Sequence, residues 1–246
     1  MSRRSHASLR RLREDDSGIS LVEWLVAMFV FGIVITLIAN LYVSTTKAMD
    51  NAQNTNQNTR SASNAMNEMA RMIRAGTDNP VAATGFGTPP PNNPAFVYAR
   101  NESVLFYAFV NLTGTAQQPI QVRLRIDATT RRLTEDIWPA ISLGNGYWSF
   151  PSETTTPQRT RILADVVAPQ TGTAAWTFRY LDVTNTPIAT GAGAAGGVAN
   201  TATTLASIAS VQVSLTVLTR LGVTAHSVSL QNTVGLPNLG LNRTIS

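Results

Sequence analysis

The most constraining feature of the chain is a run of 57 residues, 19 to 75, that contains no proline and a single glycine, Gly32. Proline and glycine are the residues that most disfavour helices, so this run can form one continuous helix. At about 1.5 Å per residue it would be roughly 85 Å long, whereas globular helices average about 11 residues. A helix of this length serves something other than an ordinary globular core.

The first half of the predicted helix is apolar enough to span a bilayer. Residues 24 to 46 carry no charge, and the core of 20 residues reads WLVAMFVFGIVITLIANLYV. About 20 apolar residues cross the hydrocarbon layer. Five arginines precede the run, and the positive-inside tendency predicts a cytoplasmic N-terminus with the rest of the chain outside. We therefore predict a transmembrane segment over 19–46, in contact with lipid.

The second half of the predicted helix, residues 47 to 75, is polar but keeps one apolar stripe. Four residues recur at spacings of four, three and four, which places them on one helix face: Ala62, Met66, Met69 and Ile73. The stripe predicts packing against the domain that follows. Gly76 and the Thr-Asp-Asn-Pro turn after it predict the end of the helix.

An acidic residue opens the apolar run, in the sequence Ser17-Gly18-Ile19-Ser20-Leu21-Val22-Glu23. A charge in a membrane segment is costly unless it is neutralised or lies near the interface, so Glu23 points to function. A secretory signal peptide would place its small-residue cleavage site after the apolar region, not before it. The alternative is an interfacial carboxylate that is favoured by the helix dipole alone.

This junction resembles the type IV prepilin signal, in which a basic leader ends in glycine and a glutamate is the fifth residue of the mature helix. Gly18, Ile19 and Glu23 match that spacing. The resemblance implies that residues 1–18 are a leader, that a prepilin peptidase cleaves between Gly18 and Ile19, and that Ile19 is then N-methylated. The chain departs from the family in beginning its mature part with isoleucine and in the acidic residues 14–16 beside the glycine.

Cleavage would give Glu23 a partner. Four residues along a helix span about 6 Å, so the carboxylate reaches the new amine of Ile19 or the amine of a neighbouring subunit. In an apolar bundle such a pair would set the axial register between subunits, because each unpaired charge would be strongly disfavoured.

Residues 76–246 predict an extracytoplasmic head domain of strands and loops. Strands are expected at 95–100, 103–110, 120–127, 130–138, 161–167, 174–181, 209–219 and 225–234. A turn from Asp127 to Thr130 predicts that 120–127 and 130–138 form a hairpin. Loops are expected at 85–95, 139–158 and 191–204. Alternation in 120–127 predicts one core face and one solvent face, with Gln121, Arg123 and Arg125 in solvent. The predicted fold class is α+β, with the long N-terminal helix packed on an antiparallel sheet. The resemblance to prepilins implies that this is a type IV pilin-like fold.

The order of elements in the head resembles the minor pilins and pseudopilins of the PilW or PulJ kind. The residues that carry this looser resemblance are Arg131-Arg132-Leu133, Phe178-Arg179-Tyr180 and Val211-Gln212-Val213-Ser214-Leu215. It implies a structural subunit of a type IV pilus or of a type II secretion-like filament. The implied partners are other pilins or pseudopilins, prepilin peptidase and an assembly platform in the inner membrane. The implied location is the cytoplasmic membrane and then the filament at the cell surface.

Catalysis finds little support in the sequence. The chain has no cysteine and two histidines, which excludes a thiolate nucleophile, a cysteine-ligated zinc and a cluster of histidines. Glu135 and Asp136 are adjacent in a predicted strand, so their side chains point to opposite faces. His226 falls in an alternating strand, where a solvent-facing or hydrogen-bonded role is expected. We expect no enzymatic activity, no cofactor and no metal.

Two other hypotheses stay open. One is a pilus-associated DNA-binding or adhesin subunit, since four arginines cluster on one predicted hairpin near aromatic residues: Arg123, Arg125, Arg131 and Arg132. Removal of residues 1–18 leaves 14 basic and 11 acidic residues, however, and this ordinary balance favours a solvated strand face. The other is an unrelated single-pass membrane-anchored protein in which the Gly-to-Glu spacing is accidental.

Overall fold

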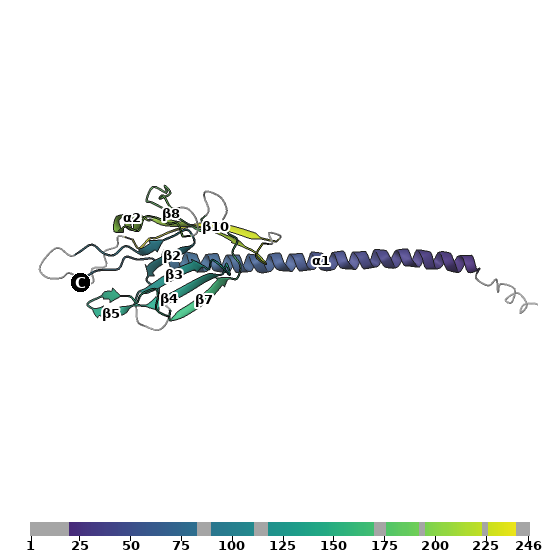
Figure 1. Ribbon diagram of the computed structural model, residues 1–246, viewed down its shortest axis with the longest axis horizontal. Coiled ribbons are helices and arrows are strands. Elements are labelled where there is room, and N and C mark those ends of the chain that lie inside the picture. The colour runs from purple at the N-terminus through teal and green to yellow at the C-terminus, as the bar shows by residue number, and fades with distance from the viewer. Residues whose placement is uncertain are drawn as a thin grey trace, which may run out of the picture. The chain divides into compact units, whose positions relative to one another are not determined.

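The structure is a computed structural model that describes residues 20–82, 90–110, 118–169, 176–191, 195–222 and 226–239. The chain divides into two compact units, Met1–Ala52 and Gln53–Ser246. The elements are one long helix, a short helix and strands that form three antiparallel sheets (Figure 1). This arrangement confirms the predicted α+β class, a long apolar helix followed by an antiparallel head.

Helix α1 runs from Leu21 to Arg74, which confirms the predicted continuous helix. A capping box begins it: the Ser20 hydroxyl accepts a hydrogen bond from the Glu23 N–H (3.2 Å), and the Glu23 carboxylate accepts one from the Ser20 N–H (3.1 Å). Its end lies at the predicted stop, where the Gly76 N–H donates to the Ile73 carbonyl oxygen at 2.9 Å. A Cβ at Gly76 would approach that same oxygen to 2.9 Å, so the stop needs glycine.

In the first unit, every described residue is exposed, including the large apolar side chains of Phe31 and Leu41. Among the described residues, α1 is the one helix long and apolar enough to cross a membrane, judged by length and composition. Together these observations support a membrane-anchored protein.

In the second unit, α1 buries one face in the head. The predicted stripe is confirmed, because all four of its residues are at most 6% exposed: Ala62, Met66, Met69 and Ile73. Ala65, Ala70 and Met72 widen the buried face. They share one core with residues of both larger sheets, including Phe106, Val122 and Val213.

A five-stranded antiparallel sheet has the order β1-β2-β3-β4-β7. Its strands are β1 (Phe96–Ala99), β2 (Ser103–Ala108), β3 (Ile120–Ile126), β4 (Leu133–Pro139) and β7 (Arg159–Ala164). The expected turn between β3 and β4 is confirmed, since Asp127 accepts hydrogen bonds from the Thr129 and Thr130 N–H groups. The inner face of this sheet contributes Val122 and Leu124 to the core shared with α1.

A three-stranded sheet has the order β10-β9-β8, with strands β8 (Phe178–Leu181), β9 (Ser210–Val217) and β10 (Val228–Gly235). Arg131 joins the two larger sheets, because the Val167 N–H donates to its carbonyl oxygen while Val167 forms a bridge with Val217 of β9. Arg131 is buried and adopts a positive φ of 57°. The prediction that Arg131 lies in the strand 130–138 is therefore wrong, since β4 begins at Leu133.

Segments predicted as loops contain regular structure. Residues 139–158 include the hairpin β5 (Ile141–Gly144) and β6 (Tyr147–Ser149). The turn between them, Asn145-Gly146, has positive φ at both residues, which suits an Asn-Gly hairpin turn. The loop predicted over 191–204 overlaps helix α2 (Ala202–Ala206) at its end. Conversely, His226 was expected in a strand but lies in a turn with φ of 62°, before β10 begins.

The outer face of the five-stranded sheet is partly covered, against the predicted solvent face. Gln121 is 5% exposed, and three residues form a second small core there: Tyr98, Leu105 and Trp138. The segment after β6 supplies the cover, since Phe150 stacks on Tyr107 and the Trp138 Nε1–H donates to the Thr155 carbonyl oxygen at 3.0 Å. Of the three residues expected in solvent, only Arg125 is exposed.

Candidate assembly site at the start of the long helix

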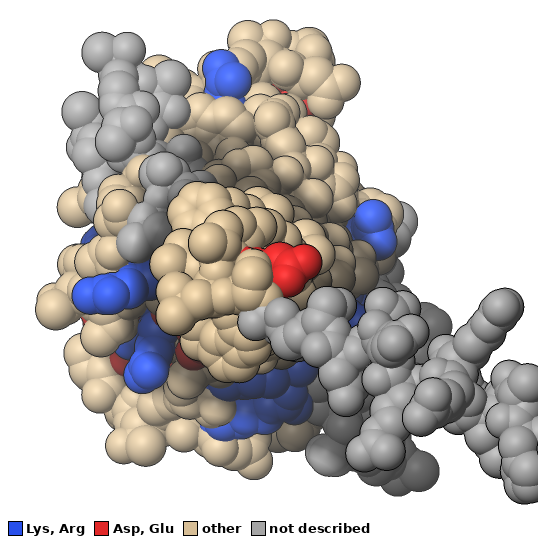
Figure 2. Space-filling view, turned by 90° about the vertical axis from the view of Figure 1, so that its right-hand side faces the viewer, with Lys and Arg blue, Asp and Glu red and all other residues tan. Residues whose placement is uncertain are grey.

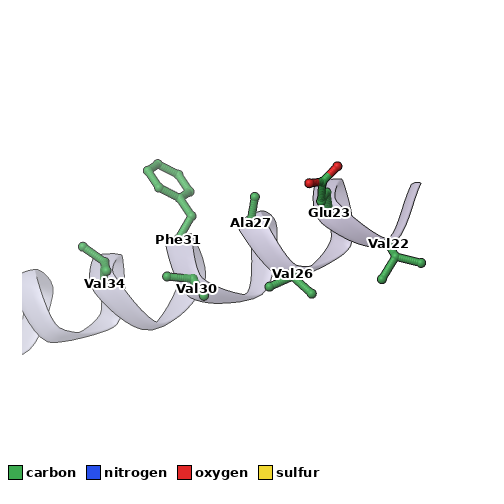
Figure 3. A pocket seen from close by; sticks show the side chains of 7 residues that line it. All are labelled: Val22, Glu23, Val26, Ala27, Val30, Phe31 and Val34. Atoms are coloured by element: carbon green, nitrogen blue, oxygen red, sulfur yellow. The ribbon is translucent and has the colours of Figure 1, made fainter. Parts of the chain in front are cut away.

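Glu23 lies in the first turn of α1, at the edge of a shallow apolar groove along the helix surface. The groove is lined by Val22, Glu23, Val26, Ala27, Val30, Phe31 and Val34. Figure 3 shows Glu23, Ala27 and Phe31 rising from the same side of the helix, as their spacing of four requires. A single carboxylate therefore lies at the N-terminal end of an otherwise apolar helix face.

The carboxylate of Glu23 has a polar partner but no cationic one in the described part of the chain. Its partner is the Ser20 N–H, and none of the ion pairs involves it. The next charged residue along α1 is Lys47, about 36 Å further along the helix axis. Within the described part of α1, no cation lies near enough to neutralise the Glu23 carboxylate.

The predicted leader (1–18) and the predicted cleavage and methylation residues, Gly18 and Ile19, lie outside the described residues. Ser20 is the first residue that the structure describes, and its N–H is the group that Glu23 accepts from. The amine that cleavage would create belongs to the residue immediately before Ser20. The Glu23 carboxylate is thus held against the backbone N–H of the first described residue.

Ser20 is a site residue that the sequence reasoning missed, because it counted only as filler between Gly18 and Glu23. The signal was present: a serine followed three residues later by glutamate, directly before an apolar run, predicts a capping box. Glu23 is consequently both the partner of Ser20 in the capping box and the only acidic group of the apolar half.

The four arginines proposed for nucleic acid do not form one surface. Arg131 is buried and donates two hydrogen bonds of 2.7 Å to the Glu102 carboxylate and a third to the Val167 carbonyl oxygen. Arg132 is exposed and lies 3.9 Å from Asp165. Figure 2 likewise shows the basic side chains of one face in several separate groups rather than in a continuous patch.

Arg123 and Arg125 do share the outer face of the sheet, but their settings differ. Arg123 donates to one oxygen of Asp136 through both Nε and Nη2, at 3.0 and 2.8 Å, and its guanidinium stacks on Trp138. The Glu153 carboxylate also lies near Arg123, with 3.5 Å between its Oε2 and the Arg123 Nη1. Arg125 is exposed and has no carboxylate at ion-pair distance among the described residues.

Glu135 and Asp136 face opposite sides of β4, as predicted. Asp136 meets Arg123 on the outer face, whereas Glu135 is fully buried on the inner face, 3.1 Å from Arg161. Arg161 also contacts Glu68 of α1, which is paired in turn with Arg71. Neither oxygen of Glu135 accepts a hydrogen bond, and Arg161 approaches it at ion-pair distance without hydrogen-bond angles. Burial therefore raises the pKa of Glu135 despite the nearby guanidinium.

His226 is partly exposed and contacts the helix. Its Nδ1 lies 3.4 Å from the Thr55 hydroxyl, and its carbonyl oxygen accepts a hydrogen bond from the buried Asn58 side chain. The predicted hydrogen-bonded role of His226 is thus confirmed, whereas its predicted place in a strand is wrong. No group of three or more His, Cys, Asp and Glu side chains able to hold a metal occurs among the described residues.

A comparison with protein-family models matches residues 15–39 to the prokaryotic N-terminal methylation motif. The match includes Gly18, Ile19, Ser20 and Glu23, and it covers none of the head. It supports a type IV prepilin-like protein, which implies processing by prepilin peptidase and assembly with other pilins. A search of the curated proteins finds no match to this chain.

Proposed function

We propose that the protein is a minor pilin or pseudopilin, a structural subunit of a type IV pilus or of a type II secretion-like filament. The observation that carries the proposal is the N-terminal half of α1: an apolar surface exposed along its whole described length, opened by one carboxylate without a cation. The matched methylation motif over the same residues supports it. We assign the chain no enzymatic activity.

The proposed mechanism is mechanical. The precursor inserts with its N-terminus in the cytoplasm and its head outside, and prepilin peptidase removes residues 1–18. An assembly platform and its ATPase then move subunits out of the bilayer. Because the apolar half of α1 has no cover within its own unit, it exchanges lipid for the helices of neighbouring subunits, while the heads form the filament surface.

Glu23 acts in this mechanism as the group that sets register. In the described chain its carboxylate is already oriented by the capping box with Ser20. The amine of a processed Ile19, either its own or a neighbour's, supplies the missing positive charge. Inside an apolar helix bundle a carboxylate without that partner is strongly disfavoured, so one axial arrangement of subunits is selected.

Substitution of Glu23 tests the proposal in cells that contain a prepilin peptidase and the assembly machinery. The Glu23→Gln protein should insert in the membrane and lose its leader as the unsubstituted protein does, but its incorporation into filaments should fall by about tenfold or more. The fall follows because a missing charge pair in an apolar bundle is worth more than the ~1.4 kcal/mol of a tenfold change. Sheared filament fractions and membrane fractions are compared by immunoblotting.

Asp50→Asn is the matched control, since Asp50 is another exposed carboxylate of α1. It should leave incorporation unchanged. Equal incorporation of the Glu23→Gln protein would remove the pairing role, and loss of incorporation in both variants would show a general demand for negative charge on α1.

A further inference from the structure

The outer face of the five-stranded sheet carries a polar groove that the proposed function does not use. The residues that line it come mainly from β1, β2, β3, the turn after β3 and the loop after β6. The residues on which the argument rests are Tyr98, Arg100, Ser103, Arg123, Arg125 and Glu153. Three guanidinium groups thus line one groove within the head.

Arg100 and Arg125 are the two guanidinium groups of the groove without a carboxylate at ion-pair distance in the described part of the chain. The Arg100 guanidinium lies 4.6 Å from the centre of the Tyr98 ring. Arg125 is the register partner of Ser103 across β2 and β3, and the Arg100 N–H donates to the Ser103 carbonyl oxygen. The two arginines therefore flank Ser103.

The acidic groups of the groove already have donors. Glu102 accepts both hydrogen bonds of the buried Arg131 fork. Asp127 accepts from the Thr130 N–H, the Thr130 hydroxyl and the Thr129 N–H, and these bonds lower the pKa of its carboxyl. Glu153 lies against Arg123. The guanidinium N–H groups of Arg100 and Arg125 are consequently the donors of this groove that lack a carboxylate partner among the described residues.

We propose that the groove is an oxyanion-binding site that holds a phosphate or sulfate group between the guanidinium groups of Arg100 and Arg125. The anion would lie beside the Ser103 hydroxyl, which is hydrogen-bonded to the Tyr98 hydroxyl at 3.1 Å. A guanidinium presents a planar fork of N–H donors that fits two oxygens of such an anion. Stacking on Tyr98 fixes the plane of Arg100 and leaves its N–H edges free, which lowers the entropy lost on binding. The inference goes beyond the proposed function and does not depend on it.

The oxyanion itself, and not an attached base, is the chemistry that this groove recognises. The Tyr98 face is occupied by Arg100 and that of Trp138 by Arg123, so neither ring is open for stacking. The phosphoryl group could be a free ion or be carried by a lipid headgroup, and the experiment must separate these two sources.

The test uses the full chain labelled with ¹⁵N in uncharged detergent micelles, and it follows the arginine Nε–H signals by NMR. Inorganic phosphate is titrated against sodium chloride at equal ionic strength, with sodium sulfate in a second series. The signals of Arg100 and Arg125, assigned by substitution, should shift and saturate with phosphate and with sulfate. Nanodiscs with phosphatidylglycerol, compared with nanodiscs of phosphatidylcholine alone, form the lipid arm, in which the same two signals should shift if the phosphoryl group comes from a headgroup.

Three variants sharpen the result. Arg100→Ala and Arg125→Ala should each weaken phosphate binding by about tenfold, as expected for loss of a charged hydrogen-bonding partner. Glu153→Gln should strengthen it, because the anion then meets less negative charge. Arg179→Ala is the matched control, since Arg179 also stacks on an aromatic ring, Trp176, away from the groove. Arg179→Ala should leave binding unchanged.

Shifts that rise linearly and equally at all exposed arginines, without saturation, would overturn the site, as would an Arg100→Ala protein that binds phosphate as tightly as the Arg179→Ala protein. These outcomes are separate from filament assembly, so failure of the oxyanion site leaves the pilin proposal standing.

Discussion

The two halves of α1 invert the usual relation between hydrophobicity and burial. From Leu21 to Thr46 the helix is largely apolar, yet every side chain is exposed, and Phe29 is 68% exposed. From Gln53 to Arg74 the helix is mostly polar, yet Met69 and Met72 are fully buried. A continuous exposed apolar surface, such as that of the first half of α1, marks an interface with lipid or protein. The polar half thus buries one face within its own chain, whereas the apolar half requires cover from outside it.

The largest expected effect contrasts two methionines of the same helix. Met69→Ala should lower the free energy of unfolding of the head by about 3 kcal/mol, because it removes a fully buried side chain and leaves a cavity. For a unit of this size that corresponds to a fall in Tm of roughly 6–12 °C. Thermal unfolding of the full chain in micelles, followed by fluorescence of the buried Trp138, measures it.

Met49→Ala is the matched control, since Met49 is 68% exposed on the same helix. Its Tm should stay within about 1 °C of the original, as for most surface substitutions. Comparable losses in the two variants would mean that the first unit contributes to the stability of the head, and the contrast between the halves would be lost.

A second prediction concerns the ion pairs that hold the polar half of α1 to the sheet. Arg161→Met should destabilise the head by about 2 kcal/mol at neutral pH, because it removes the guanidinium that lies closest to the buried carboxylate of Glu135. Glu68 keeps Arg71, so it is less affected. The double variant Glu135→Gln with Arg161→Met should recover most of the loss, and urea unfolding of the four proteins gives the coupling.

The pH dependence of this loss has a definite sign. Burial raises the pKa of Glu135 above its unfolded value, so the folded protein keeps a proton that the unfolded chain has released. Between those two pKa values stability falls as pH rises, and above the folded value the full penalty applies. The loss in Arg161→Met should therefore shrink as pH falls toward the ordinary glutamate range. A loss that is independent of pH, and not rescued by Glu135→Gln, would contradict the role of Glu135.

Glu68 works in the opposite direction. Burial alone would raise the pKa of Glu68, but hydrogen bonds from Arg71 and Arg161 and their charges outweigh burial and lower it. Its contribution to stability is therefore present above the ordinary glutamate pKa and is lost as pH falls through the lowered value. This opposite slope lies at more acidic pH than that of Glu135, so the two can be separated in one titration of stability.

The smallest expected effect is at the start of the apolar half. Ser20→Ala removes the hydroxyl that accepts the Glu23 N–H and should weaken the first turn of α1 by about 1 kcal/mol. Hydrogen exchange in micelles should become faster at the Glu23 amide and stay unchanged beyond the second turn. Ser44→Ala, within the exposed part of the same helix, is the control. Unaltered exchange at Glu23 would show that the capping box is not what orders this end.

Much of the fold could be predicted from the sequence where local patterns dominate. The absence of proline marked α1, the stripe at Met66 and Met69 marked its buried face, and Asp127 marked the turn between β3 and β4. Each of these depends on residues that are close in sequence. The methylation-motif match over residues 15–39 supports the interpretation of Gly18, Ile19 and Glu23 in the same way.

What escaped prediction depends on contacts between distant residues. Arg131 looked like a surface cation until the structure paired it with Glu102 and with the backbone near Val167. Arg123 looked solvated because alternation cannot reveal that residues 150–155 cover its end of the sheet. The hairpin β5–β6 was predictable from the sequence, because an Asn-Gly pair such as Asn145-Gly146 is a strong hairpin signal.

The most direct test of the central claim is the N-terminus of the protein after co-expression with a prepilin peptidase, read by intact-mass and peptide mass spectrometry. The account predicts loss of residues 1–18 and a new, N-methylated terminus at Ile19, with processing abolished in a Gly18→Leu variant. An N-terminus that stays intact, or cleavage after the apolar run at residue 39 or beyond, would contradict it.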